Sequence, residues 1–147
     1  MIFLMGSVLA LSFPGCGKKE NISDWTLRVG IVTYTQDDPF INTMTEQIRE
    51  DLKLKESKDM KIIVSVKNGD NDQRDQDELV EEMIAAGCDV LCVNLVDRTA
   101  PSDIIKAARQ EKIPVIFFNR EPVKEDLMQW DQLYYVGCDA KQSGEMQ

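Results

Sequence analysis

The sequence predicts an α/β protein of three layers (α/β/α), in which helices cover both faces of a parallel sheet. Apolar segments rich in Val and Ile alternate along the chain with segments of helical periodicity, and this alternation is typical of right-handed crossovers and a parallel sheet. The apolar segments are apolar at consecutive positions, as expected of strands covered on both sides. At 147 residues, the chain is long enough for about one domain.

Five apolar segments are expected to form the strands, and each is followed by a polar loop. The first contains Val29, Ile31 and Val32, residue types that favour a covered, pleated strand. The expected strands are residues 27–33, 60–67, 89–95, 114–119 and 133–137. Because open α/β sheets bind small molecules at the carboxyl ends of their strands, the polar residues just after these segments are the candidates for a site.

Three helices are expected between the strands, at residues 39–57, 72–86 and 101–112. Pro39 suits the first turn of the first helix. The second helix has apolar residues such as Leu79 and Met83 at helical spacing and is expected to end at Gly87. The acidic stretch 70–75 has an arginine where a calcium loop needs a ligand, so it is expected to be a loop that caps the second helix.

Composition excludes several functions. The net charge of -9 argues against nucleic acid, whose phosphates need a basic surface, and it would repel an anionic membrane surface. The chain has no histidine, which removes the common hydrolytic triads and histidine metal ligands. Phosphate-binding glycine loops and the G-x-S-x-G elbow are absent from the sequence. We therefore expect a protein that is not an enzyme.

The N-terminus is expected to direct the chain out of the cytoplasm. Residues 1–13 are almost entirely apolar but too short to span a membrane, which takes about 20 apolar residues. The segment 1–15 is therefore interpreted as a signal peptide, Cys16 as a lipidated residue after a lipoprotein cleavage box, and 16–26 as a polar tether. The alternative is a partial secretory signal in which Cys16 has no special role.

The other cysteines are Cys88, Cys92 and Cys138. With no histidine and no second cysteine cluster, a zinc site is not expected. Cys92 lies in an apolar segment and is expected to pack in the core. A disulfide from Cys88 or Cys92 to Cys138 stays open, because it depends on how close the strands bring them.

Four segments at the expected strand ends are similar to those of a known family, in the same order and at compatible spacing. They are Tyr-Thr-Gln-Asp-Asp-Pro-Phe at 34–40, Asn-Leu-Val-Asp at 94–97, Phe-Phe-Asn-Arg-Glu-Pro at 117–122 and Tyr-Tyr-Val-Gly at 134–137. Together they resemble the galactose/glucose-binding proteins of bacterial ABC sugar uptake systems. The resemblance implies a type I periplasmic-binding-protein fold, in which two α/β lobes trap a sugar between them.

The resemblance implies four sugar-binding residues. Asp38 resembles the carboxylate that accepts hydrogen bonds from sugar hydroxyls, bonds that are stronger than neutral ones. Phe40 resembles the aromatic ring that stacks on the sugar, Tyr34 the tyrosine at the cleft edge, and Asn119 an asparagine that both donates and accepts. No cofactor is implied for this chain, and a calcium site is implied only in the second lobe.

Each of these residues also has a purely structural interpretation. Asp38 could be the N-cap of the first helix, Phe40 a core or staple residue, Tyr34 a packing residue at the strand edge, and Asn119 an ordinary turn residue. The neighbouring polar residues at the strand ends are expected to shape their loops. Asn94 and Asp97 do so after the third strand, with a position facing the cleft as the alternative, and an Arg120–Glu121 ion pair does so after the fourth.

The resemblance also implies the domain organisation. Residues 27–137 are expected to form an N-terminal sugar-binding lobe that lacks its returning segment, and 138–147 the start of a truncated second lobe, with the first hinge crossing near Gly137. On this interpretation the chain alone binds a monosaccharide weakly or not at all. Which pyranose it binds is left open.

The expected function is a solute-binding lipoprotein, extracytoplasmic or periplasmic and attached to a membrane by its lipid. The expected partners are a monosaccharide, an ABC permease and a chemoreceptor, with no nucleic acid. The alternative is the ligand-sensing core of a LacI-type transcriptional regulator, which shares the lobe architecture. Against it stand the acidic charge and a signal-like segment where a helix-turn-helix is expected.

Overall fold

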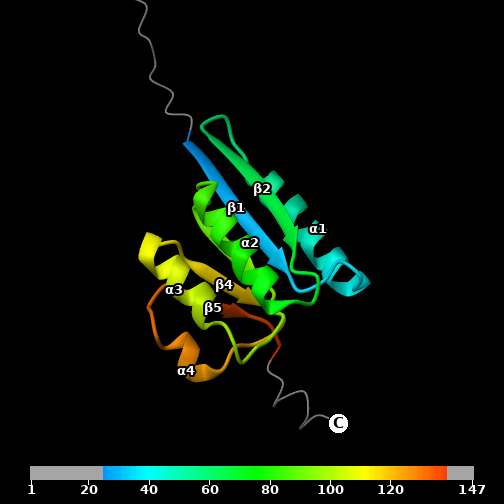
Figure 1. Cartoon of the computed structure of the whole chain (residues 1–147). Helices are drawn as coiled ribbons and strands as arrows, with labels where there is room; N and C mark the ends of the chain where they lie inside the picture. The colour runs from blue at the N-terminus through cyan, green and yellow to red at the C-terminus, as the bar shows by residue number, and fades with distance from the viewer. Residues whose placement is uncertain (1–24, 139–147) are drawn as a thin grey trace, which may run out of the picture.

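The computed structural model describes residues 25–138, which form a five-stranded parallel sheet flanked by helices (Figure 1). The strands are β1 (Trp25–Thr33), β2 (Met60–Asn68), β3 (Val90–Val93), β4 (Val115–Phe118) and β5 (Leu133–Val136). The helices are α1 (Pro39–Leu54), α2 (Gln73–Ala85), α3 (Ser102–Glu111) and α4 (Lys124–Leu127). The predicted fold class, five strands and three helices are confirmed; the short α4 was not predicted.

The sheet has the order β2-β1-β3-β4-β5. From β1 the chain crosses to β2 on one side and then returns to β3 on the other, so Val29 pairs with Val64 of β2 and with Val90 of β3. The direction of winding therefore reverses between β1 and β3. In an open α/β sheet such a switch point, at the carboxyl ends of the strands, is where a crevice for a ligand forms.

Two separate apolar cores show that helices cover both faces. On one face, side chains of α2 and α3, among them Val80, Met83 and Ile104, pack against the sheet. On the other face, Met44 and Ile48 of α1 pack on a smaller core of residues from β1, β2 and β4. The aliphatic strands are thus covered on both sides near β1, which accounts for their lack of alternation.

Local signals fix the helix ends. Asp38 and Asp72 are the N-caps of α1 and α2, and each carboxylate accepts from two backbone N–H groups of the first turn. The loop before α2 therefore caps it, as predicted. After α2, Gly87 has a positive φ of 79°, the left-handed conformation that glycine adopts without strain. The α1 helix ends earlier than predicted, because Ser57 pairs with Met60 in a tight turn into β2.

Three cysteines can be placed: Cys88, Cys92 and Cys138 are free thiols, so no disulfide joins them. Cys92 packs against the smaller core, as predicted. Among residues 25–138, no helix is long and apolar enough to cross a membrane, and no cluster of three potential metal ligands occurs. The predicted signal peptide, Cys16 and nearly all of the segment 138–147 lie outside the described residues.

Candidate functional site

The loop that follows β1 joins two of the predicted site residues. The Tyr34 hydroxyl donates a hydrogen bond of 2.6 Å to Asp38 Oδ2. Asp38 Oδ1 accepts from the backbone N–H groups of Phe40 (2.9 Å) and Ile41 (3.4 Å) at the start of α1. Asp38 is therefore the N-cap of α1, as its structural interpretation predicts. Its second oxygen, Oδ2, is held by Tyr34 in the loop that follows the carboxyl end of β1, where the family resemblance predicts a group that binds the ligand.

These contacts keep the Asp38 carboxylate ionised. The hydrogen bond from Tyr34 lowers the pKa of Asp38, and the backbone N–H groups of Phe40 and Ile41 and the positive charge of Arg120 lower it further. The same hydrogen bond to Asp38 is the main cause that raises the pKa of Tyr34. The pair therefore presents an anionic acceptor beside a neutral phenol, a combination that suits hydroxyl groups.

Arg120 connects three loops at this edge. Its guanidinium carbon lies 3.7 Å from the centre of the Tyr34 ring, in cation–π geometry. Its Nη1 donates to the carbonyl oxygens of Leu95 (3.2 Å) and Val96 (2.8 Å), which follow β3. The predicted ion pair between Arg120 and Glu121 is wrong: neither residue takes part in an ion pair in the described part of the chain. The sequence of the strand-end segments could not predict the contacts of Arg120, because the residues that it contacts are distant in sequence.

Asn119 directly follows β4 in a left-handed conformation, with φ of 62°. Its N–H donates to Val136 O, and its carbonyl accepts a 3.1 Å bond from the Tyr135 hydroxyl. The backbone of Asn119 thus makes the turn that its structural interpretation expects. Its half-buried side chain makes no hydrogen bond to any residue within 25–138, so its amide remains free for another partner.

Asn94, which follows β3, is fully buried. Its Nδ2 donates a 3.0 Å bond to Phe118 O, while its Oδ1 is buried with no partner within the described residues. A buried carbonyl oxygen without a partner costs about 1–3 kcal/mol, so this end of β3 holds an acceptor that the described residues leave unused. The bond to Phe118 O and the full burial of Asn94 agree with its expected role in shaping the loop and not with the alternative that it faces the cleft.

Gln76 of α2 holds the loop after β3 in place. Its Nε2 donates to Asn94 O at 2.9 Å and its Oε1 accepts from Val96 N–H at 3.0 Å, and the side chain is fully buried. Asp97 does shape this loop, as predicted: its Oδ1 accepts from the N–H and the hydroxyl of Thr99 at 2.8 and 2.7 Å. No signal in the sequence singled out Gln76.

Phe40 lies in the first turn of α1 and is 60% exposed. A core or staple residue would be covered, so the structural interpretation of Phe40 is wrong. An exposed ring next to Asp38 is compatible with stacking on a sugar. We refer below to Tyr34, Asp38, Asn94, Asn119 and Arg120 as the strand-end cluster.

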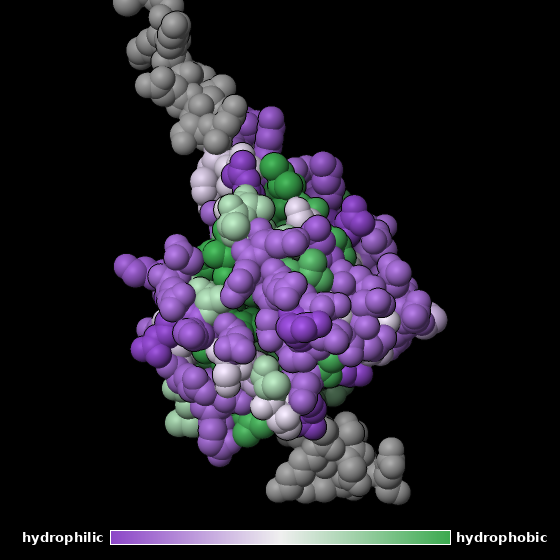
Figure 2. All heavy atoms as spheres, viewed as in Figure 1, coloured by the Kyte–Doolittle hydropathy of each residue, from purple (hydrophilic) through white to green (hydrophobic). Residues whose placement is uncertain are grey.

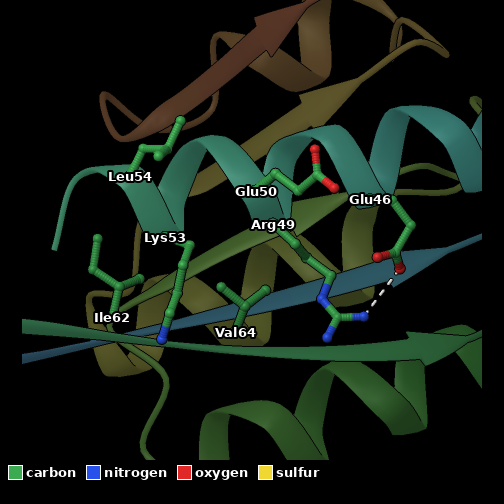
Figure 3. Close-up of a pocket in the computed structure, with 7 residues that line it drawn as sticks. All are labelled: Glu46, Arg49, Glu50, Lys53, Leu54, Ile62 and Val64. Carbon is green, nitrogen blue, oxygen red and sulfur yellow. Dashed lines mark hydrogen bonds and ion pairs between the residues drawn. The ribbon is translucent and has the colours of Figure 1, made fainter.

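A hollow of about 580 Å³ lies elsewhere, between α1 and β2 (Figure 3). Its lining mixes charged residues of α1, including a Glu46–Arg49 ion pair of 3.0 Å, with the apolar side chains of Leu54, Ile62 and Val64. None of its lining residues belongs to the strand-end cluster. Apart from the fully buried Asn94, the residues of the cluster are partly exposed. The face of the molecule shown in Figure 2 is mainly hydrophilic.

Residues 29–147 match the family model of the periplasmic binding protein domain. The chain is 34% identical over 120 residues to the D-galactose/methyl-galactoside binding periplasmic protein of Haemophilus influenzae, a match that covers 82% of this chain and 35% of that protein. These findings agree with the resemblance of the four strand-end segments.

Solved structures show the same fold. A carbohydrate transporter solute binding protein from Chloroflexus aurantiacus, in complex with D-glucose, has a TM-score of 0.65 and 28% identity, over 82% of this chain and 33% of that one. A galactofuranose binding protein has a TM-score of 0.69 and 20% identity, and the match covers 82% of this chain and 38% of that one. The chain thus spans about a third of the length of each relative.

Proposed function

Because the chain belongs to the periplasmic binding protein domain family, we propose that its strand-end cluster is one wall of a monosaccharide site. The observation that carries the proposal is the convergence of three loops, after β1, β3 and β4, through Arg120. These loops flank the switch point of the sheet, where α/β proteins bind ligands.

The wall supplies the groups that a pyranose needs. Asp38 accepts from sugar hydroxyls in charge-assisted bonds, and the exposed Phe40 ring covers the apolar C–H face of the sugar. Asn119 donates and accepts through its half-buried amide. Tyr34 and Arg120 act indirectly: they hold the Asp38 carboxylate and the three loops in position.

The sugar is proposed to be galactose or glucose. The Haemophilus influenzae relative is named for D-galactose and methyl-galactoside, and the Chloroflexus aurantiacus structure contains D-glucose. Both hexoses present several equatorial hydroxyls to a carboxylate, so the cluster by itself does not choose between them. Other groups, on a second lobe, would complete the selection.

The complete protein is proposed to act as an extracytoplasmic solute receptor. Two lobes close around the sugar, because contacts made only in the closed state shift the population toward it. The closed form then delivers the sugar to an ABC permease, and a chemoreceptor is a further proposed partner. Anchoring through a lipid on Cys16 remains part of the proposal. The named relatives are binding proteins, and we expect no catalytic activity.

The test is titration of the 147-residue chain with galactose and glucose, followed by NMR chemical-shift changes. We expect millimolar affinity, because one wall makes only part of the contacts, and we expect the shifts to cluster at Asp38, Phe40 and Asn119. Asp38→Asn should abolish them. The matched control is Asp37→Asn, which removes a neighbouring exposed carboxylate and should leave the chemical-shift changes in place. Shifts remote from the cluster, or sub-micromolar affinity for either sugar, would contradict the proposal.

A further inference from the structure

The opposite end of the sheet carries a different surface, at the amino ends of β1 and β2. Trp25, the first residue of β1, is 55% exposed, and Leu54, the last residue of α1, is 80% exposed. The Trp25 N–H donates a 3.2 Å bond to Asp59 O, in the turn that leads into β2. Trp25 also pairs with Met60 in the sheet. In Figure 1 the start of β1 and the loop from α1 to β2 lie at the same end of the molecule.

Lysines are concentrated at this end. Residues 53–61 contain Lys53, Lys55, Lys58 and Lys61 but only two acidic residues, in a chain of net charge -9. One acidic residue is already neutralised, because Glu56 pairs with Lys53 at 2.8 Å and accepts from the Ile62 N–H. The other three lysines are exposed and form no ion pair with any residue in the described range 25–138. We name Trp25, Leu54, Lys55, Lys58 and Lys61 the amino-end patch.

This combination of groups fits a lipid surface. Tryptophan is favoured at the boundary between headgroups and acyl chains, an exposed leucine gains by entering it, and exposed lysines attract anionic headgroups.

The anionic group of the strand-end cluster lies far from this surface. Asp38, the carboxylate of the strand-end cluster, lies beyond the other end of β1, and a strand of nine residues rises about 30 Å. The Debye length is about 8–10 Å at physiological salt. A charge three Debye lengths away is largely screened, so the charges near this end determine its interaction with a surface. Within residues 53–61 the lysines outnumber the acidic residues four to two.

We propose that the amino-end patch docks on the surface of a bilayer that contains anionic phospholipid, with Trp25 at the headgroup boundary. Docking by this end directs the strand-end cluster away from the membrane. The proposal stands apart from the sugar site and from lipidation of Cys16, because it depends only on side chains of the amino-end patch.

The test uses the full chain with Cys16→Ser and Trp130→Phe, so that no lipid is attached and Trp25 is the remaining tryptophan. Vesicles of phosphatidylcholine and phosphatidylglycerol should shift Trp25 fluorescence to shorter wavelength, and 0.5 M salt should reverse the shift. Lys55→Gln with Lys58→Gln should weaken vesicle binding about 30-fold, since each lysine near an anionic surface contributes about five-fold.

The matched control is Lys106→Gln with Lys124→Gln, two exposed lysines of α3 and α4 that remove the same charge elsewhere. Co-sedimentation of both pairs in the chain with its native Trp130 gives a second measurement, which does not depend on how well Trp130→Phe folds. A 30-fold difference between the pairs supports the proposal. Equal loss in both pairs, equal binding to pure phosphatidylcholine, or an unshifted Trp25 would overturn it.

Discussion

Gln76 offers the most direct test of how the strand-end cluster is held. The side chain is fully buried and bridges α2 to the loop after β3, through bonds of 2.9 Å to Asn94 O and 3.0 Å from Val96 N–H. Gln76→Met keeps the length of the side chain but removes both bonds. Each buried group left without a partner costs about 1–3 kcal/mol, and the added apolar burial offsets about 1 kcal/mol. The expected loss of unfolding free energy is about 3 kcal/mol.

Urea denaturation measures this loss. With an m-value of about 1.5 kcal/mol/M, the midpoint of Gln76→Met should fall by about 2 M. The control is Gln47→Met on the exposed face of α1, where the only side-chain bond is to Asp51 at 3.0 Å. An exposed substitution of this kind stays within about 0.5 kcal/mol, or about 0.3 M. If Gln76→Met also stayed within about 0.3 M of the parent, the buried bridge would not hold the loop.

Two further predictions concern ionisable groups. Burial raises the pKa of the Cys92 thiol to about 11, so at pH 8 only about one molecule in a thousand carries the reactive thiolate. Iodoacetamide should therefore label the exposed Cys138 far faster than Cys92 in the native chain, and peptide mapping measures both rates. Equal labelling would show that Cys92 is accessible. The pKa of Asp38 is lowered, first by the hydrogen bond from Tyr34. Ionised Asp38 therefore stabilises the fold above the ordinary aspartate pKa, and this stability is lost as the pH falls through the lowered folded value. Tyr34→Phe should raise the Asp38 titration midpoint measured by carboxyl NMR, and an unchanged midpoint would contradict the assigned cause.

The strands and main helices could be predicted because their signals are local. Consecutive aliphatic residues, proline at the start of α1 and Gly87 after α2 each act within a few residues of the element they define. The four-residue α4 has no buried residue and no side-chain cap, so its sequence carries no comparable signal.

The strand-end cluster was only partly predictable. Tyr34 and Asp38 are four residues apart and hydrogen-bond within one loop, so their proximity follows from the sequence. The partners of Arg120 are 24 or more residues away, and only the order of the strands brings them together. Gln76 was missed because a glutamine in an amphipathic helix is normally expected on the surface.

The cluster is held without help from a second lobe. Asp38 is fixed by Tyr34 and the N-terminus of α1, and Arg120 by the backbone after β3. Asn94 is fixed by Phe118 and Gln76. A wall that is already ordered costs little conformational entropy when a ligand arrives. In a two-lobed receptor, most of the free energy that a sugar gains from a second lobe would then be available to drive closure rather than to order the first wall.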